Sequence, residues 1–231
     1  MEVEEILGWF SKQTADIEHL DFRGNEIIKS NVIRHDIEII DPEYAQRLMN
    51  GPVYGLLYPT KDNRLVIYID NKQDSVNFLC TLLHELTHYS DYSNFATIHT
   101  VPFRELLDDF YFVLWSEFHA SYISYRFAIR LGKDYIMADD TIEELIGKYR
   151  NYVSGKKQIQ LSEYANFCFR LYGEIFALSD EFSDEAAIAR AFEVVPDRFS
   201  SIFDFLLYHK TYASLIESYN EYKSLIDTAD N

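Results

Sequence analysis

Residues 83–93, LLHELTHYSDY, carry His84, Glu85 and His88 in the order H-E-x-x-H, within a stretch whose spacing predicts a helix over about 75–92. Since an α-helix turns about 100° per residue, His88 lies about 40° and Glu85 about 100° around the axis from His84. The apolar residues fall on the opposite side, between about 160° and 280°, and comprise Leu82, Leu86, Leu79, Leu83 and Val76. One face of this helix is therefore expected to pack against the core, and the histidine face to open onto polar surroundings.

Two histidines one helical turn apart suit a zinc ion, because imidazoles at i and i+4 can reach the same ion. Glu85 projects to the side, where its carboxylate can take a proton from a zinc-activated water, whose pKa falls to about 7. The alternative interpretation is that His84 and His88 are ordinary polar residues of a solvated helix face. The uncharged residues at 86 and 87, the absence of proline and the well-formed amphipathic pattern favour the zinc site.

A catalytic zinc usually has three protein ligands and one position for water, so a third ligand is needed. The metzincin pattern H-E-x-x-H-x-x-G-x-x-H fails, since the chain has Asp91 and Asn94 where that pattern has Gly and His. Glu117, twenty-nine residues after His88, is the candidate on a second predicted helix. His119 lies about 200° around that helix from Glu117, so the two cannot face one ion.

Small residues accompany Glu117 on its side of the second helix. Those within about 60° of it are Ala120, Ser121, Ser124 and Ala128. A stripe of small residues lets two helix backbones approach closely, as a short Glu side chain requires if it is to reach an ion held by a neighbouring helix. The alternative interpretation is that Glu117 is a surface charge and the small residues are ordinary core packing.

The motif H-E-L-T-H, followed after this gap by E-F-H-A-S-Y-I-S, resembles the gluzincin metallopeptidases. The likeness is closest to the short intracellular members found in phages and mobile elements, whose second helix carries Glu-x-x-Ala followed by an apolar residue. Some of these relieve repression by cleaving a regulator. The resemblance spans about residues 65–131. It implies zinc held by His84, His88 and Glu117, with Glu85 as general base.

One position departs from the family pattern. Many gluzincins place Asp four residues after the ligand Glu, where it orients a histidine, and this chain has Ser121 there. Asp91, on the histidine side of the first helix, is a candidate substitute, the alternative being a solvated surface acid. His99 and Tyr92 are candidates for stabilising the oxyanion or contacting substrate.

The charge and the cysteine content of the chain indicate which kinds of partner and which cellular compartment are expected. The chain of 231 residues has a formal net charge of −17, which repels phosphate backbones and anionic lipids, so neither a nucleic-acid nor a membrane partner is expected. Its two cysteines, Cys80 and Cys168, provide at most one bridge, as in proteins of a reducing compartment. The acidic start MEVEEILGWF is not a signal peptide, and no apolar run approaches the ~20 residues of a membrane span. A cytoplasmic protein is therefore predicted.

The front half of the chain predicts an α+β arrangement. Residues 2–20 have the spacing of an amphipathic helix, and 26–40, rich in β-branched residues, predict one or two strands. A short helix ended by Asn50-Gly51-Pro52 follows, and then VYGLLYP and RLVIYID predict a hairpin, its first strand weakened by Gly and Pro. Asp74 or Ser75 is expected to cap the histidine helix.

The back half predicts only helices. A long helix is expected from Pro102 to Leu131, closed by Gly132, and then helices at about 139–153, 159–178, 182–194 and 198–227. The prediction is a zincin-like catalytic core over residues 1–132 and an all-helical extension over 133–231 packed on it.

Three hypotheses follow. The first is an intracellular zinc metallopeptidase that hydrolyses a protein or peptide substrate. The second is a non-catalytic protein-interaction module on a metallopeptidase scaffold. The third is a structural helical protein with a chance motif. Metal content distinguishes the third from the others, and the activity of a Glu85→Gln variant distinguishes the first two.

Overall fold

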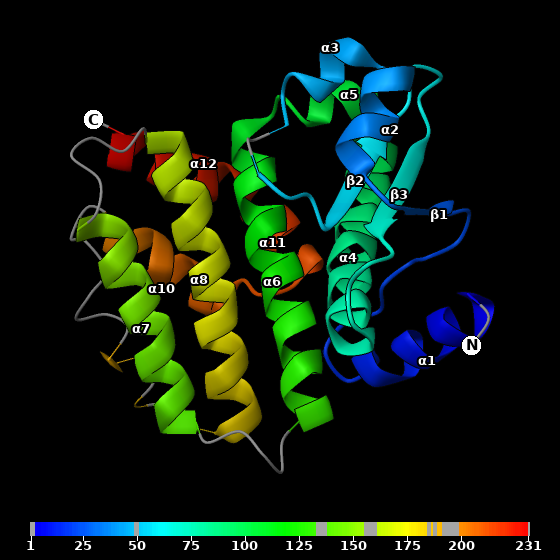
Figure 1. Cartoon of the computed structure of the whole chain (residues 1–231). Helices are drawn as coiled ribbons and strands as arrows, with labels where there is room; N and C mark the ends of the chain where they lie inside the picture. Colours follow the sequence, from blue (N-terminus) through cyan, green and yellow to red (C-terminus); the bar gives the residue numbers. More distant parts are fainter. Residues whose placement is uncertain are drawn as a thin grey trace. The chain divides into compact units, whose positions relative to one another are not determined.

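The computed structural model describes residues 3–48, 51–132, 138–154, 161–183, 186, 189–190 and 199–230. They fall into two units, Met1–Asp108 and Asp109–Asn231, each described by itself below. The first unit combines helices with a three-stranded sheet, and the elements of the second are helices (Figure 1). The predicted α+β class is therefore confirmed.

The sheet has the strand order β1-β3-β2, with β1 at Ile27–Ser30, β2 at Gly55–Pro59 and β3 at Leu65–Asp70. The hairpin predicted from the sequence is confirmed, because β2 pairs antiparallel with β3. β1 pairs parallel with β3 on its other side. β2 is consequently an edge strand, and Gly55 lies opposite Ile69 in the register.

The prediction of strands over 26–40 is wrong beyond residue 30. Helix α2 covers Ile33–Ile40, and it buries Ile33 and Ile37, which lie one turn apart. β-branched residues favour strands only weakly, and packing of the i, i+4 pair outweighs that preference here. The short α3, Pro42–Ala45, follows, capped by the Asp41 carboxylate. The core that α2 and α3 share with the hairpin contains Ile33, Ile37, Ala45, Tyr58, Val66 and Tyr68.

Helix α4, Ser75–His99, is the histidine helix, and it packs against β2 and β3 (Figure 1). Its start was predicted correctly, since the Asp74 side chain accepts from two backbone N–H groups of the first turn. It continues seven residues beyond the predicted end and stops where Thr100 adopts a left-handed conformation. Leu82, Leu83 and Leu86 of the predicted apolar stripe are buried, whereas Leu79 is half-buried and Val76, near the start of the helix, is 55% exposed.

Two predicted long helices are shorter or divided. Helix α1 is Val3–Thr14, and the helix expected over 102–131 consists of α5, Phe103–Leu106, and α6, Phe110–Gly132. Asp109 explains the division, because its carboxylate accepts from the backbone N–H of Phe112 and starts a new helix.

The second unit contains α6, α7 at Ala138–Ser154, α8 at Leu161–Phe182, α10 at Ser200–Tyr208, α11 at Tyr212–Glu217 and α12 at Tyr219–Asp230. The single helix predicted over 198–227 is three helices, since a capping box at Thr211 begins a new one. Most of the helix predicted over 182–194 lies outside the described residues.

α6 and α8 make the closest helix contact described in the second unit. A Cβ atom built on Gly173 of α8 would lie 2.4 Å from the carbonyl oxygen of Phe118 and 3.0 Å from Cβ of Ser121 on α6. Ser121 of the predicted small stripe thus serves the contact with α8. This packing groups α6 with the helical half, so the boundary between the units falls at 108–109, whereas the sequence predicted 132.

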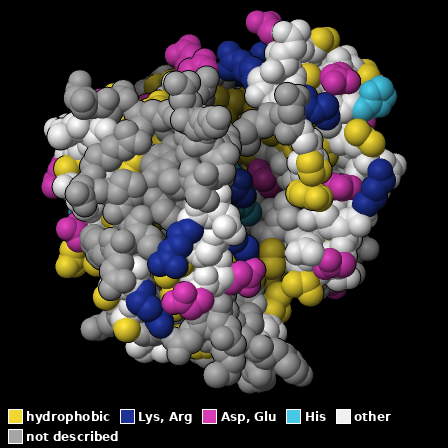
Figure 2. Space-filling view, turned by 60° about the vertical axis from the view of Figure 1, so that its left-hand side comes forward, with side chains coloured by type: hydrophobic (Ala, Val, Ile, Leu, Met, Phe, Trp, Pro, Cys, Tyr) yellow, Lys and Arg dark blue, Asp and Glu magenta, His cyan; other side chains and the backbone are white. Residues whose placement is uncertain are grey.

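Figure 2 shows acidic side chains set among basic and apolar ones over the described part of one face. Charges of both signs are therefore mixed on that part of the surface, although the chain carries a net charge of −17. Among the described residues, no helix combines the length and the apolar character needed to cross a bilayer.

Candidate metal centre

Helix α4 presents its two histidines to one point. The Nε2 atoms of His84 and His88 lie 3.1 Å apart, and their rings meet edge to face with centroids 4.7 Å apart. A tetrahedral zinc ion with bonds of about 2.0–2.1 Å holds two nitrogens about 3.3 Å apart. The pair therefore already has the spacing of two ligands of one ion, and the imidazole donor set suits zinc.

Glu85 lies between α4 and the backbone of the edge strand. Its side chain is largely buried, and a Cβ atom built on Gly55 of β2 would lie 2.7 Å from Glu85 Oε1 and 2.8 Å from Glu85 Cγ. The carboxylate thus projects toward β2, to the side of the histidine pair.

Tyr44 of α3 lies close enough to Glu85 for the carboxylate charge to act on its hydroxyl. Burial, and then the charge of Glu85, raise the pKa of the Tyr44 phenol well above its usual value. The ring packs edge-on against Tyr58 with centroids 5.1 Å apart, and it lines a pocket of about 120 Å³ together with Arg47 and Arg104. The Tyr44 phenol therefore holds its proton more firmly than an exposed tyrosine does.

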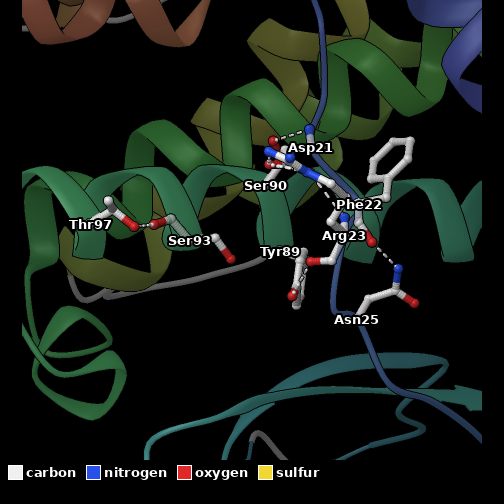
Figure 3. A network of polar contacts seen from close by, with 8 residues as sticks. All are labelled: Asp21, Phe22, Arg23, Asn25, Tyr89, Ser90, Ser93 and Thr97. Atoms are coloured by element: carbon white, nitrogen blue, oxygen red, sulfur yellow. Dashed lines mark hydrogen bonds and ion pairs between the residues drawn. The ribbon is translucent and has the colours of Figure 1, made fainter.

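The part of α4 that follows His88 is tied to the segment after α1 (Figure 3). Ser90 Oγ accepts from the backbone N–H of Asp21 at 3.0 Å, and the Tyr89 hydroxyl donates to the carbonyl oxygen of Arg23 at 2.9 Å. The Arg23 guanidinium pairs with Asp21 and holds the pKa of that carboxyl down at about 2. These bonds are made by the protein alone, so this part of α4 is fixed without a metal.

The remaining residues predicted for the site lie further along α4. Asp91 is 1% exposed, so it is not a solvated surface acid. Tyr92 is also buried, and its ring centroid is 6.3 Å from that of His88. His99 is the last residue of the helix, exposed and stacked on Phe95. It is eleven residues beyond His88, about 16 Å along the helix axis, so it lies far from the histidine pair.

Glu117 lies on α6 in the second unit, so its assignment as third ligand stays a prediction. Within that unit its Oε2 atom is 3.6 Å from Nε of Arg170 on α8. His119 is fully buried and stacks on Trp115 with ring centroids 4.7 Å apart. His119 is therefore a core histidine packed on Trp115.

Three residues near these groups were missed by the sequence interpretation. Gly55 had a signal, because a glycine inside a strand often marks a close approach, but it was taken only as a weakness of the strand. Tyr44 and Arg170 had none, since each meets Glu85 or Glu117 only through tertiary packing.

Comparison with models of protein families, with curated proteins and with solved structures finds no match to this chain. The case for a function therefore depends on the residues and their geometry.

Proposed function

We propose that this chain is a zinc-dependent peptidase of the gluzincin type, built on a zincin-like core. The observation that carries the proposal is the pair of Nε2 atoms, 3.1 Å apart, on a helix that also presents Glu85. The motif resemblance supports Glu117 as the third ligand. The substrate is a protein or peptide.

Zinc, when bound, supplies a Lewis acid that polarises a peptide carbonyl and lowers the pKa of a water molecule to about 7. Glu85 accepts a proton from the attacking water and returns it to the leaving amine. Its burial against β2 limits the positions open to the carboxylate, which favours general-base catalysis.

Elemental analysis of protein purified without added metal tests the ligand set. Wild type is expected to hold about one zinc per chain, and the double variant His84→Ala/His88→Ala none. Glu117→Gln should bind zinc much more weakly, because the amide lacks the charge of the carboxylate. His99→Ala is the matched control, an exposed histidine of the same helix, and should keep wild-type zinc. Unchanged zinc in the double variant would refute the site.

Glu85→Gln separates a peptidase from a non-catalytic module on the same scaffold. The variant should keep its zinc and its stability while hydrolysis of labelled casein falls by about 10²–10⁴-fold, the usual worth of a proton-transfer group. A zinc-loaded wild type that cleaves no faster than Glu85→Gln would leave the interaction module as the better description.

A further inference from the structure

We propose that Gly55 is a positioning residue for Glu85, in that the bare backbone of β2 at this residue sets where the Glu85 carboxylate can lie. This inference rests on the proposed function, since it concerns the group assigned there as general base. Gly55 itself touches neither the metal ligands nor a substrate in this account. It acts through the side chain that it contacts.

The space beside Gly55 is already filled by two side chains of α4. A Cβ atom at this position would lie 2.6 Å from Cγ2 of Thr81, 2.7 Å from Oε1 of Glu85 and 2.8 Å from Cγ of Glu85. Ordinary contacts of a Cβ atom are 3.4 Å or longer. Thr81 and Glu85 are one helical turn apart, so both lie on the side of α4 that meets the edge strand. Only glycine fits between them and the strand.

Thr81 and the strand are joined to each other by hydrogen bonds through Gln73. The Thr81 hydroxyl donates to Oε1 of Gln73 at 2.8 Å, and Gln73 Nε2 donates to the carbonyl oxygen of Tyr54 at 3.1 Å. The same carbonyl accepts from the backbone N–H of Asp70 at 2.9 Å. The network therefore joins the start of β2 to β3 and to the second turn of α4. The strand and Thr81 are tied to each other through Gln73.

The Glu85 carboxylate is at the far end of a flexible side chain, whereas the opposing atoms of residue 55 belong to the backbone of the strand. A methyl group at residue 55 would therefore displace the Glu85 carboxylate before it moves α4. The three atoms nearest to that methyl position belong to Thr81 and Glu85. A methyl group at residue 55 is therefore expected to act on Glu85 before it acts on the imidazoles of His84 and His88.

The test uses Gly55→Ala in a Thr81→Ser background. Serine keeps the hydroxyl that donates to Gln73 and removes Cγ2, so of the three nearest contacts only the two with Glu85 remain. The reference proteins are Thr81→Ser, Thr81→Ser/Glu85→Gln and, as a matched glycine control, Gly8→Ala, because a Cβ atom at Gly8 meets nothing within 4 Å.

Each protein is loaded with cobalt(II) in place of zinc, and its visible d–d band is recorded, since the band reports on the groups around the metal. Gly55→Ala/Thr81→Ser should bind as much cobalt as Thr81→Ser but show the band of the Glu85→Gln protein. Its hydrolysis of labelled casein should fall at least tenfold in kcat. Gly8→Ala should match wild type in all three measurements.

The outcomes distinguish the two proposals. If wild type takes up neither zinc nor cobalt, the proposed function fails. If cobalt binds normally and Gly55→Ala/Thr81→Ser has the band and kcat of Thr81→Ser, the proposed function stands and the role of Gly55 is overturned. If Gly55→Ala/Thr81→Ser loses cobalt binding while Thr81→Ser/Glu85→Gln retains it, the methyl group has moved the helix and Gly55 is a structural residue only.

Discussion

Replacing Gly173 with alanine is expected to push α6 away from α8 and to lower the free energy of unfolding of the second unit. The new Cβ atom would lie 2.4 Å from the carbonyl oxygen of Phe118 and 2.8 Å from the backbone nitrogen of Tyr122. Close carbon–oxygen contacts settle at about 3.3–3.6 Å, so the two helices must separate locally by about 1 Å. Both opposing atoms belong to backbone, which cannot rotate out of the way.

The magnitude follows from three effects. A gap of about 0.5–1 Å forfeits a quarter to a half of the dispersion energy of each contact that it opens. Overpacking of this kind usually costs about 1–3 kcal/mol, and a clash with backbone belongs near the upper limit. The higher helix propensity of alanine offsets about 1 kcal/mol of this loss in stability. The expected net loss is therefore about 2 kcal/mol.

Urea denaturation followed by tryptophan fluorescence measures this loss. A Trp9→Phe background leaves Trp115, which is fully buried in the second unit, as the only tryptophan. With a slope of about 2 kcal/mol per molar urea, the midpoint should fall by about 1 M. The control is Gly147→Ala in α7, where a Cβ atom meets nothing within 4 Å, and it should raise the midpoint slightly. A midpoint that rises for both variants would refute the close contact at Gly173.

Two further predictions concern stability. Glu181→Gln should cost about 1.5–3 kcal/mol, because the Glu181 carboxylate accepts from Arg126 and Arg130 at 2.6–2.9 Å. Burial opposes ionisation of Glu181, but the two arginines outweigh burial and lower the pKa of Glu181 below the usual 4.5. The difference in unfolding free energy between wild type and variant should therefore be present above pH 4.5 and vanish as acid protonates Glu181. Urea midpoints measured across this pH range test this expectation. Tyr89→Phe should lower the stability of the first unit by about 1 kcal/mol through loss of the bond to the Arg23 carbonyl, measured by the fluorescence of Trp9 in a Trp115→Phe background.

The sequence predicts the histidine helix well because the evidence for that helix is local. Asp74 precedes a periodic stretch and caps it, and the one-turn spacing of His84 and His88 alone brings their ring nitrogens to one side. The hairpin is equally local, since two apolar runs separated by a short polar loop pair with each other. Each of these predictions needs only the geometry of one element or of two neighbours.

The failures share a different cause. The run over 33–40 has strand composition, but its helix is decided by Ile33 and Ile37 packing into a core that includes Tyr58 and Tyr68 from the hairpin. α4 extends beyond its predicted end because Phe95, three residues past that end, is buried. In both cases packing against residues distant in sequence decides the local secondary structure. A short stretch of sequence does not contain those residues, so it does not predict the outcome.

The same reasoning explains why the motif could be found and its surroundings could not. A motif specifies chemical groups, and a helix specifies their angles about one axis. The placement of Glu85 depends in addition on a glycine thirty residues earlier, and the position of α6 depends on Gly173, fifty-six residues after Glu117. Both glycines matter because they lack a side chain, so neither offers a pattern that marks its partner.

The pairing of Glu117 with Arg170 is compatible with a ligand role for Glu117. The arginine is half exposed and its Nε atom is 3.6 Å from the carboxylate, an arrangement worth about 0–1 kcal/mol in water. Zinc held by protein ligands contributes on the order of 10 kcal/mol, so the ion would displace the arginine and not the reverse. A guanidinium held this loosely therefore leaves the Glu117 carboxylate available to a metal ion.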